Sequence, residues 1–327
     1  MKKKSNCLDG ANVLVTGGTG SFGTKFVETV LANFRVKKLI IFSRDELKQF
    51  EMQQRIRDPR LRFFIGDVRD PERLHRAFHD VQVVVHAAAL KQVPSCEYNP
   101  IEAVKTNIGG AQNIINAAID NDVPKVIALS TDKAANPINL YGATKLCSDK
   151  LFIAGNAYSG RAHTRFSVVR YGNVIGSRGS VIPLFKAQAK TGTFTVTDKR
   201  MTRFWITLEQ GVKFVLECLE IMQGGELFIP KIPSMNIMDL AKAVDPQCKC
   251  KVTGIRPGEK LHEVLLPKGE SLRALEFSDK YIVEPDSQSF EAMRHRGGRR
   301  ISSDFEYASN TNKKWLTVAQ LREMITS

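Results

Sequence analysis

Short apolar runs alternate with amphipathic segments through the first half of the chain, and this pattern predicts a layered fold of strands and helices. Several runs consist almost entirely of Val, Ile, Leu and Phe, as expected for strands that are covered on both faces. The segments between them are long enough for the helical crossovers that parallel strands need. The predicted strands are Asn12–Thr16, Lys38–Phe42, Leu61–Ile65, Val81–Val85, Lys125–Ser130 and Phe166–Arg170, and the predicted helices include Phe22–Asn33, Asp45–Arg57, Pro71–Phe78, Pro100–Asn121 and Tyr141–Ala157.

The pattern changes after about residue 172, where Gly and Pro become frequent and the predicted elements shorten. We therefore predict an α/β fold with a Rossmann-like, doubly wound parallel sheet and a smaller C-terminal region. The predicted division is a dinucleotide-binding domain over residues 1–173 and a mainly substrate-binding region over residues 174–327. A segment at about 203–230 is expected to pack back on the sheet.

The composition is that of an ordinary globular protein, with 327 residues of which 43% are hydrophobic and 25% are charged. No run reaches the roughly 18 apolar residues of a membrane span. The basic start Met1–Cys7 is not followed by an apolar segment of signal-peptide length, so we expect a cytoplasmic protein without membrane insertion.

The net charge of +14 raises the question of nucleic-acid binding, but Lys and Arg are spread over the chain. Dense basic runs occur only at Lys2–Lys4 and Arg294–Arg300. A basic surface also attracts phosphate-bearing small molecules, and we favour this interpretation over a nucleic-acid partner. The six cysteines are mostly isolated, and the close pair Cys248 and Cys250 has no neighbours at zinc-ligand spacing, so we expect no metal site.

A glycine-rich turn, Thr16–Gly23, follows the first predicted strand and precedes a predicted helix. Glycines at these places allow a tight turn and a close approach of the backbone to a pyrophosphate, and the helix start adds free N–H groups. A purely structural turn is the alternative, but the strand–turn–helix context favours a dinucleotide site. The expected cofactor contacts in this turn are Gly17, Thr19, Gly20, Ser21, Phe22 and Gly23.

The end of the second predicted strand indicates which dinucleotide is bound. Arg44 is placed to bind a ribose 2′-phosphate with support from Ser43 and Lys48, which favours NADP. Asp45 keeps NAD as the alternative, and Arg44 could also be a surface residue at a helix start. After the third strand, Asp67 and Val68 are expected beside the adenine.

Tyr141 and Lys145 lie four residues apart on one face of a predicted helix. A free tyrosine has a pKa near 10, and a nearby ammonium group and an oxidised nicotinamide would lower it. Tyr141 could then accept a proton from a substrate hydroxyl, and Lys145 could also hold the nicotinamide ribose. A buried Tyr beside a surface Lys is the alternative.

These motifs together resemble the extended short-chain dehydrogenase/reductase superfamily: Thr16–Gly23, Ala87–Lys91, Asn107, Ser130–Lys133, Tyr141–Lys145 and Arg170–Asn173. Within it the chain is similar to the inverting UDP-N-acetylglucosamine 4,6-dehydratases over roughly residues 8–270. Four stretches carry this resemblance: His86–Pro100, Ser130–Lys145, Met201–Phe204 and Gly254–Glu263.

The resemblance implies a reaction for the segment Thr131–Lys133, where retaining relatives usually carry Thr-Asp-Glu. Tyr141 would remove the C4 hydroxyl proton as hydride passes to NADP⁺, Lys133 would take the C5 proton, and Asp132 would protonate the departing C6 hydroxyl. Hydride would return to C6, and protonation of C5 on the opposite face would invert that centre. Lys133 must be neutral for this role, and desolvation and neighbouring cations could lower its pKa.

The implied substrate is UDP-N-acetylglucosamine, and the implied product is UDP-2-acetamido-2,6-dideoxy-β-L-arabino-hex-4-ulose, an early intermediate of pseudaminic acid or related surface-glycan synthesis. NADP would be tightly bound and recycled within each turnover. A UDP-sugar 4-epimerase, a retaining 4,6-dehydratase and a non-catalytic NADP-binding protein are the alternatives. The resemblance also implies a homo-oligomer, with a hexamer as one candidate.

The resemblance assigns further residues to the site, beside Lys91 and Asn173, which follow strand ends where open α/β sheets bind ligands. A surface salt bridge is the alternative for Arg203 and Arg256, and His262 is expected to be structural. Ala87, Ala88, Lys91 and Val174 are implied for the cofactor, and Lys91, Asn173, Arg178, Val181, Thr195, Met201, Arg203, Arg256 and Glu259 for the substrate.

Overall fold

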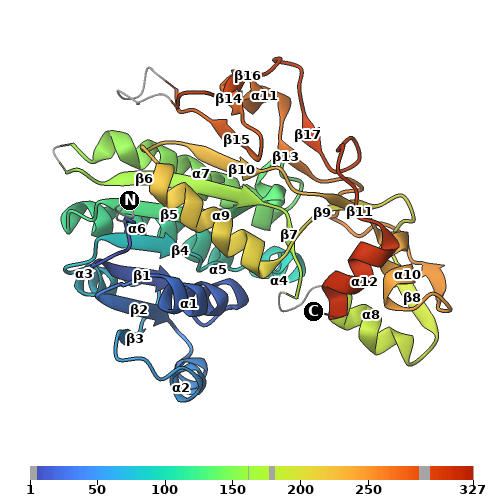
Figure 1. Cartoon of the computed structure of the whole chain (residues 1–327), viewed down its shortest axis with the longest axis horizontal. Helices are drawn as coiled ribbons and strands as arrows, with labels where there is room; N and C mark the ends of the chain where they lie inside the picture. The colour runs from blue at the N-terminus through green and yellow to red at the C-terminus, as the bar shows by residue number, and fades with distance from the viewer. Residues whose placement is uncertain (1–5, 161, 177–180, 287–294, 327) are drawn as a thin grey trace, which may run out of the picture.

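The computed structural model describes residues 6–160, 162–176, 181–286 and 295–326, and its centre is a ten-stranded sheet (Figure 1). The strand order is β16-β14-β15-β10-β6-β5-β4-β1-β2-β3, so the chain reverses its direction of travel across the sheet between β1 and β4. Ligands of open α/β sheets bind beyond the strand ends at such a reversal. The strands are β1 (Asn12–Thr16), β2 (Lys38–Ser43), β3 (Leu61–Ile65), β4 (Val83–His86), β5 (Lys125–Thr131), β6 (Arg165–Tyr171), β10 (Leu227–Pro230), β14 (Ala274–Glu276), β15 (Lys280–Val283) and β16 (Arg299–Arg300).

The parallel part of the sheet agrees with the hydrophobic pattern of the sequence. All residues of β1 and β4 are buried, which is why these strands lack polar alternation. β1 to β6 pair only in parallel, and the six strand predictions are confirmed close to their expected ends. The predicted α/β fold with a doubly wound sheet is therefore confirmed.

The first half of the chain supplies the sheet only as far as β6, but the sheet continues beyond that strand. β10 adds to β6 in parallel, and β15 then pairs with β10 in antiparallel orientation, followed by β14 and β16. The sheet is therefore mixed, because a hairpin from the C-terminal part of the chain covers what would otherwise be an open edge. The predicted domain boundary at residue 173 stays a prediction.

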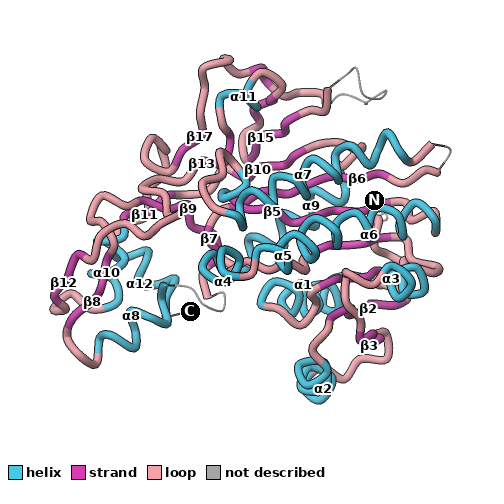
Figure 2. The backbone as a smooth tube through the Cα atoms, turned by 180° about the vertical axis from the view of Figure 1, so that it is seen from behind, coloured by secondary structure: helices cyan, strands magenta, loops and turns pink. Residues whose placement is uncertain are grey.

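Helices cover both faces of the sheet. α9 lies across the face seen in Figure 1 and packs against α1, whereas α6 and α7 contact each other on the opposite face in Figure 2. The helices of this part are α1 (Ser21–Asn33), α2 (Glu46–Arg55), α3 (Pro71–Ala77), α4 (Val93–Tyr98), α5 (Pro100–Val104), α6 (Gly110–Asp120), α7 (Leu140–Tyr158), α9 (Leu208–Ile221) and α11 (Lys268–Ser271), with a 3-10 turn at Asp132–Ala134.

A second apolar cluster forms beside the sheet, at the right of Figure 1. Trp205 is buried in it, and Phe185 stacks on Phe194 with ring centres 4.7 Å apart. The cluster is built from α8 (Val181–Ala189), β8 (Thr193–Val196), α10 (Ile237–Val244), β12 (Lys249–Val252) and α12 (Val318–Thr326). Small sheets join it to the rest: β7 (Asn173–Val174), β9 (Thr202–Ile206) and β11 (Ser234–Asn236) form one, and β13 (Val264–Leu266) and β17 (Tyr307–Ala308) form another.

Across the residues that the structure describes, helices are too short or too polar to span a bilayer.

Candidate active site

The glycine-rich turn between β1 and α1 forms one wall of a cavity. Gly17 has a φ of +65°, and a Cβ atom there would lie 2.9 Å from the backbone nitrogen of Ala88. At Gly23 a Cβ would lie 2.5 Å from Gly18 Cα, so only glycine lets α1 pack on the turn. The turn is therefore a cradle shaped by the absence of side chains, with the start of α1 at its edge.

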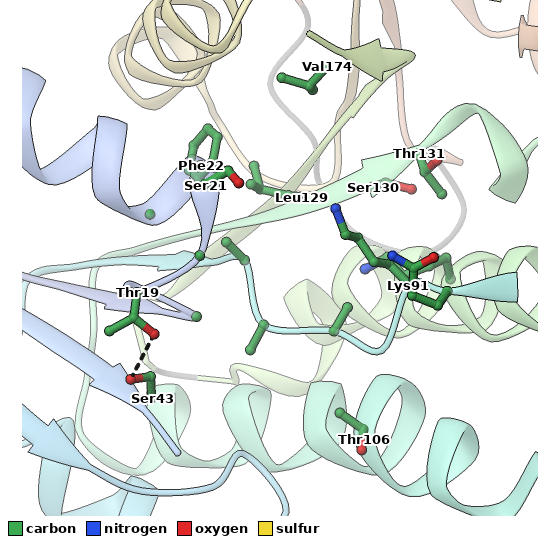
Figure 3. A pocket seen from close by; sticks show the side chains of 18 of the residues that line it. Thr19, Ser21, Phe22, Ser43, Lys91, Thr106, Leu129, Ser130, Thr131 and Val174 are labelled. Atoms are coloured by element: carbon green, nitrogen blue, oxygen red, sulfur yellow. Dashed lines mark hydrogen bonds between the residues drawn. The ribbon is translucent and has the colours of Figure 1, made fainter. Parts of the chain in front are cut away.

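The cavity has a volume of about 650 Å³ and extends from this turn to the ends of β4, β5 and β6. In Figure 3, Thr19 and Ser43 lie together at one end, joined by a hydrogen bond of 3.3 Å between their hydroxyl oxygens. Lys91 and Thr131 lie toward the other end. All cofactor residues named from the sequence line this cavity: Gly17, Thr19, Gly20, Ser21, Phe22, Gly23, Ser43, Arg44, Lys48, Asp67, Val68, Ala87, Ala88, Lys91, Tyr141, Lys145 and Val174.

Charged groups line the cavity where β2 and β3 end. Asp45 caps the start of α2 by accepting a hydrogen bond from the backbone of Lys48, and it also pairs with the Lys48 side chain. Arg44 lies 3.6 Å from Asp67. Although burial opposes ionisation of Asp67, its hydrogen bond with Arg69 and the charge of Arg44 lower its pKa. The acidic groups at this end are therefore already paired with cations of the chain.

The predicted catalytic residues gather where β5 ends and α7 begins. Thr131, Lys133, Tyr141 and Lys145 line the cavity, and Asp132 is fully buried behind them. Asn139 caps α7 by accepting a hydrogen bond of 2.8 Å from Gly142, which fixes the first turn that carries Tyr141. The same side chain donates to the carbonyl of Gly258, so the C-terminal part of the chain is tied to the start of this helix.

Burial raises the pKa of Tyr141 to about 12. The largest opposing effect comes from the charge of Lys133, followed by a hydrogen bond with Thr131. Burial lowers the pKa of Lys145, against the nearby charge of Asp149. The chain's main contribution to the acidity of Tyr141 therefore comes from Lys133, whereas the sequence had suggested Lys145.

Lys133 is surrounded by oxygen atoms. Its Nζ lies 3.0 Å from Asp132 Oδ1, 3.4 Å from Asn173 Oδ1 and 3.6 Å from Glu263 Oε1. Burial alone would lower the pKa of Lys133, but the charges of Asp132 and Glu263 outweigh it and raise that pKa above its usual range. The expectation of a lowered pKa is corrected here, because carboxylates dominate its surroundings.

Glu263 is a residue of this site that the sequence did not reveal. It lies in the same stretch, Gly254–Glu263, that had pointed to Arg256, and its neighbour His262 was expected to be structural. His262 Nδ1 lies 2.8 Å from Thr202 Oγ1, a contact that fits a structural role. Only its closeness to Lys133 in space identifies Glu263, although the stretch itself was a usable signal.

A π-helical turn, Lys105–Gly109, interrupts the single helix predicted over Pro100–Asn121 and separates α5 from α6. It places the Asn107 side chain against Leu90, where it accepts from the backbone N–H at 2.8 Å and donates to the carbonyl at 2.9 Å. It also donates to Thr144 on α7. The turn therefore holds the loop that carries Lys91 against the helix that carries Tyr141, a common use of π turns near sites.

The predicted substrate residues divide into two groups. Lys91, Asn173 and Val181 line the cavity, and Arg178 lies outside the described residues. The others are not among the described residues that line the cavity. Thr195 bonds to Gln188, and Met201 is buried. Arg203 donates to the carbonyls of Thr202, Lys260 and Leu261 and lies 3.7 Å from both Glu259 and Glu263. Arg256 is exposed, and Glu259, which faces its backbone N–H, is partly buried.

Comparison with known proteins relates the chain to enzymes of sugar nucleotides. Residues 13–285 match the family model described as polysaccharide biosynthesis protein. The chain is 53% identical to the UDP-N-acetylglucosamine 4,6-dehydratase (inverting) of Campylobacter jejuni, over 96% of this chain and 97% of that protein. It is 41% identical to a UDP-glucose 4-epimerase of Rickettsia conorii, over 96% and 94% of the two chains.

A solved structure is also similar over nearly the whole chain. The X-ray structure of Pen from Bacillus thuringiensis superposes with a TM-score of 0.90 at 39% identity and covers 98% of each chain. The similarity therefore includes both the sheet and the second apolar cluster.

Proposed function

This chain belongs to the polysaccharide biosynthesis protein family, and we propose that it is an inverting UDP-N-acetylglucosamine 4,6-dehydratase. The observation that carries the proposal is the pairing of buried Asp132 with Lys133, 3.0 Å apart, next to Tyr141 on the cavity. Such a pair supplies an acid and a base for removing water from neighbouring carbons. The 53% identity to the Campylobacter jejuni enzyme of that name supports the same activity.

A nicotinamide dinucleotide fits the cavity, because the cavity has a volume of about 650 Å³ and extends from the glycine turn before α1 to Tyr141 and Lys145. When bound, it would supply the oxidant that accepts a hydride from C4 of the sugar and gives it back at C6. Of the two dinucleotides we propose NADP, held at its 2′-phosphate by Arg44 and Ser43. The pairing of Asp45 with Lys48 supports this choice, because Asp45 then presents less negative charge to a phosphate.

The chain's own residues would move the protons. Tyr141 Oη would accept the proton of the C4 hydroxyl as the ketone forms. Lys133 Nζ would take the C5 proton, and the electron pair of that C–H bond would form the C5–C6 double bond. As the C6–O bond breaks, Asp132 would give its proton to the departing hydroxyl, which leaves as water. A proton delivered later to the other face of C5 would invert that carbon.

A UDP-sugar 4-epimerase is the second candidate, because the Rickettsia relatives that carry this name share about 40% of the residues. A 4-epimerase needs the Tyr–Lys pair but does not need an acid and a base at C5 and C6. The Asp132–Lys133 pair on the cavity therefore favours the dehydratase.

Product analysis separates these candidates. After incubation with UDP-N-acetylglucosamine in D₂O, we expect a 6-deoxy-4-keto sugar that has lost one water, carries deuterium at C5 and is inverted there. Mass spectrometry and NMR read these features. A product with retained C5 would contradict inversion, and an epimer of unchanged mass would identify the 4-epimerase. The homo-oligomer and the place in pseudaminic acid or related glycan synthesis stay predictions.

A further inference from the structure

We propose that Glu263 is a positioning residue that strengthens Lys133 as the base for the C5 proton. This inference rests on the proposed function, since it concerns the step at C5. Glu263 lies 130 residues from Lys133 along the chain, on the loop before β13, whereas Asp132 is the neighbour of Lys133 in the 3-10 turn.

The surroundings of Glu263 show that its carboxylate is directed to the cluster of cations. Oε1 lies 3.6 Å from Lys133 Nζ and 3.7 Å from Arg203 Nε. The residue is 2% exposed, and Oε2 is buried without a hydrogen-bond partner among the described residues. Burying a carboxylate without full hydrogen bonding costs free energy of folding. We therefore infer that the Glu263 carboxylate has an electrostatic role.

The backbone of Glu263 is fixed on both sides. Its N–H donates to Ser309 Oγ at 2.9 Å, and its carbonyl accepts from the Ser309 N–H at 2.8 Å. Ser309 Oγ in turn lies 2.7 Å from Thr202 Oγ1, on the strand that carries Arg203. The backbone that carries the carboxylate is therefore held to the strand of Arg203 through Ser309.

The acidic side chains around Lys133 can stabilise its protonated form. Asp132 and Glu263 both flank the Lys133 amino group. When Lys133 takes the C5 proton, a positive charge forms between them, and Glu263 stabilises that charge. Asp132 is uncharged while it holds the proton for the C6 hydroxyl, so it gains a negative charge only as the C6–O bond breaks. Glu263 is thus the carboxylate that keeps its charge throughout.

The pKa directions agree with this assignment. Glu263 is among the groups that raise the pKa of Lys133. Burial raises the pKa of Glu263 itself, with Lys133 and Arg203 opposing that effect. Loss of the Glu263 charge would leave Lys133 with the cations Arg203, Lys91 and Lys260 near it, which makes the ammonium less stable and the amine a weaker base.

The test compares Glu263→Gln with the wild-type enzyme, using UDP-N-acetylglucosamine deuterated at C5. On the high-pH plateau, where Lys133 is neutral, we expect kcat to fall about tenfold and the C5 deuterium isotope effect to rise, because C5 deprotonation becomes slower. The acid limb of the pH profile should move to lower pH by about one unit or more, since a weaker base stays unprotonated to lower pH. The two profiles should therefore converge at acid pH.

Two further variants make the outcome specific. Glu263→Asp keeps the charge, and we expect an acid limb close to wild type with a smaller rise of the isotope effect; this variant carries the test if Glu263→Gln does not fold. Glu284→Gln is the matched control, because Glu284 is also a buried carboxylate with one unpartnered oxygen, paired with Arg300 away from the cavity. It should keep the wild-type isotope effect and pH limb.

The inference would be overturned if both Glu263 variants kept the wild-type isotope effect and acid limb. It would also be overturned if Glu284→Gln showed the rise of the isotope effect and the shift of the acid limb that are expected for Glu263→Gln. These results differ from a failure of the proposed function, which would appear in the wild-type enzyme as a product that has not lost water.

Discussion

The two ends of the cavity differ in how their residues are brought together. At the end formed by Thr16–Gly23 and the turn after β2, the residues that make contact come from strand–turn–helix units that follow one another along the chain, as Thr19 with Ser43 and Arg44 with Asp67. At the other end, Lys133 meets Glu263 and Asn173, which come from distant parts of the chain. The first end follows from local geometry, whereas the second depends on how the C-terminal part packs on the sheet. Substitutions at the two ends should therefore have separable effects.

The largest effect on turnover is expected at Tyr141, which lies at the catalytic end of the cavity. Tyr141→Phe removes the proton acceptor but keeps the ring, so kcat should fall by about 10²–10⁴-fold. The affinity for NADP, measured by calorimetry, should stay close to that of the wild type. Tyr158→Phe on the same helix is the control, because Tyr158 is exposed and should leave turnover unchanged. Intact turnover in Tyr141→Phe would show that another group takes the C4 proton.

A smaller effect is expected at the cofactor end alone. Arg44→Ala should weaken NADP binding by about tenfold to a hundredfold, because it removes charge-assisted hydrogen bonds, and should leave NAD binding unchanged. Arg69→Ala is the matched control, since Arg69 pairs with the same Asp67 but is not among the described residues that line the cavity. Equal losses for both dinucleotides would argue against NADP preference.

The smallest effect is expected at Asn107, which joins the loop that carries Lys91 to α7. Asn107→Ala would leave the N–H of Leu90 without its partner, at a cost of about 1–3 kcal/mol in the free energy of unfolding. Chemical denaturation measures this change. Asn113→Ala on α6 removes a single bond to the carbonyl of Val68 and should cost less. An equal loss in both variants would mean that Asn107 is not a special anchor for this loop.

Comparison of the two ends also explains what the sequence could predict. The strand pattern, the glycine turn and the Tyr141–Lys145 spacing are local, so the sheet and the cavity lining near the cofactor could be predicted. The charge state of Lys133 could not, because Glu263 has no fixed spacing from it. The π turn at Asn107 was also not predicted, because the sequence pattern was interpreted as one continuous helix over Pro100–Asn121 and π turns are rare.

The position of β10 matters for the order in which the chain can fold. Arg165–Tyr171 of β6 is almost wholly buried, and β10 (Leu227–Pro230) pairs with the edge of β6 that faces away from β5. During synthesis, the first 173 residues would emerge with this edge of β6 unpaired, and unpaired edges are the places where chains associate wrongly. A nascent chain shorter than about 230 residues therefore exposes an apolar strand edge, which β10 covers and the hairpin of β14 and β15 extends.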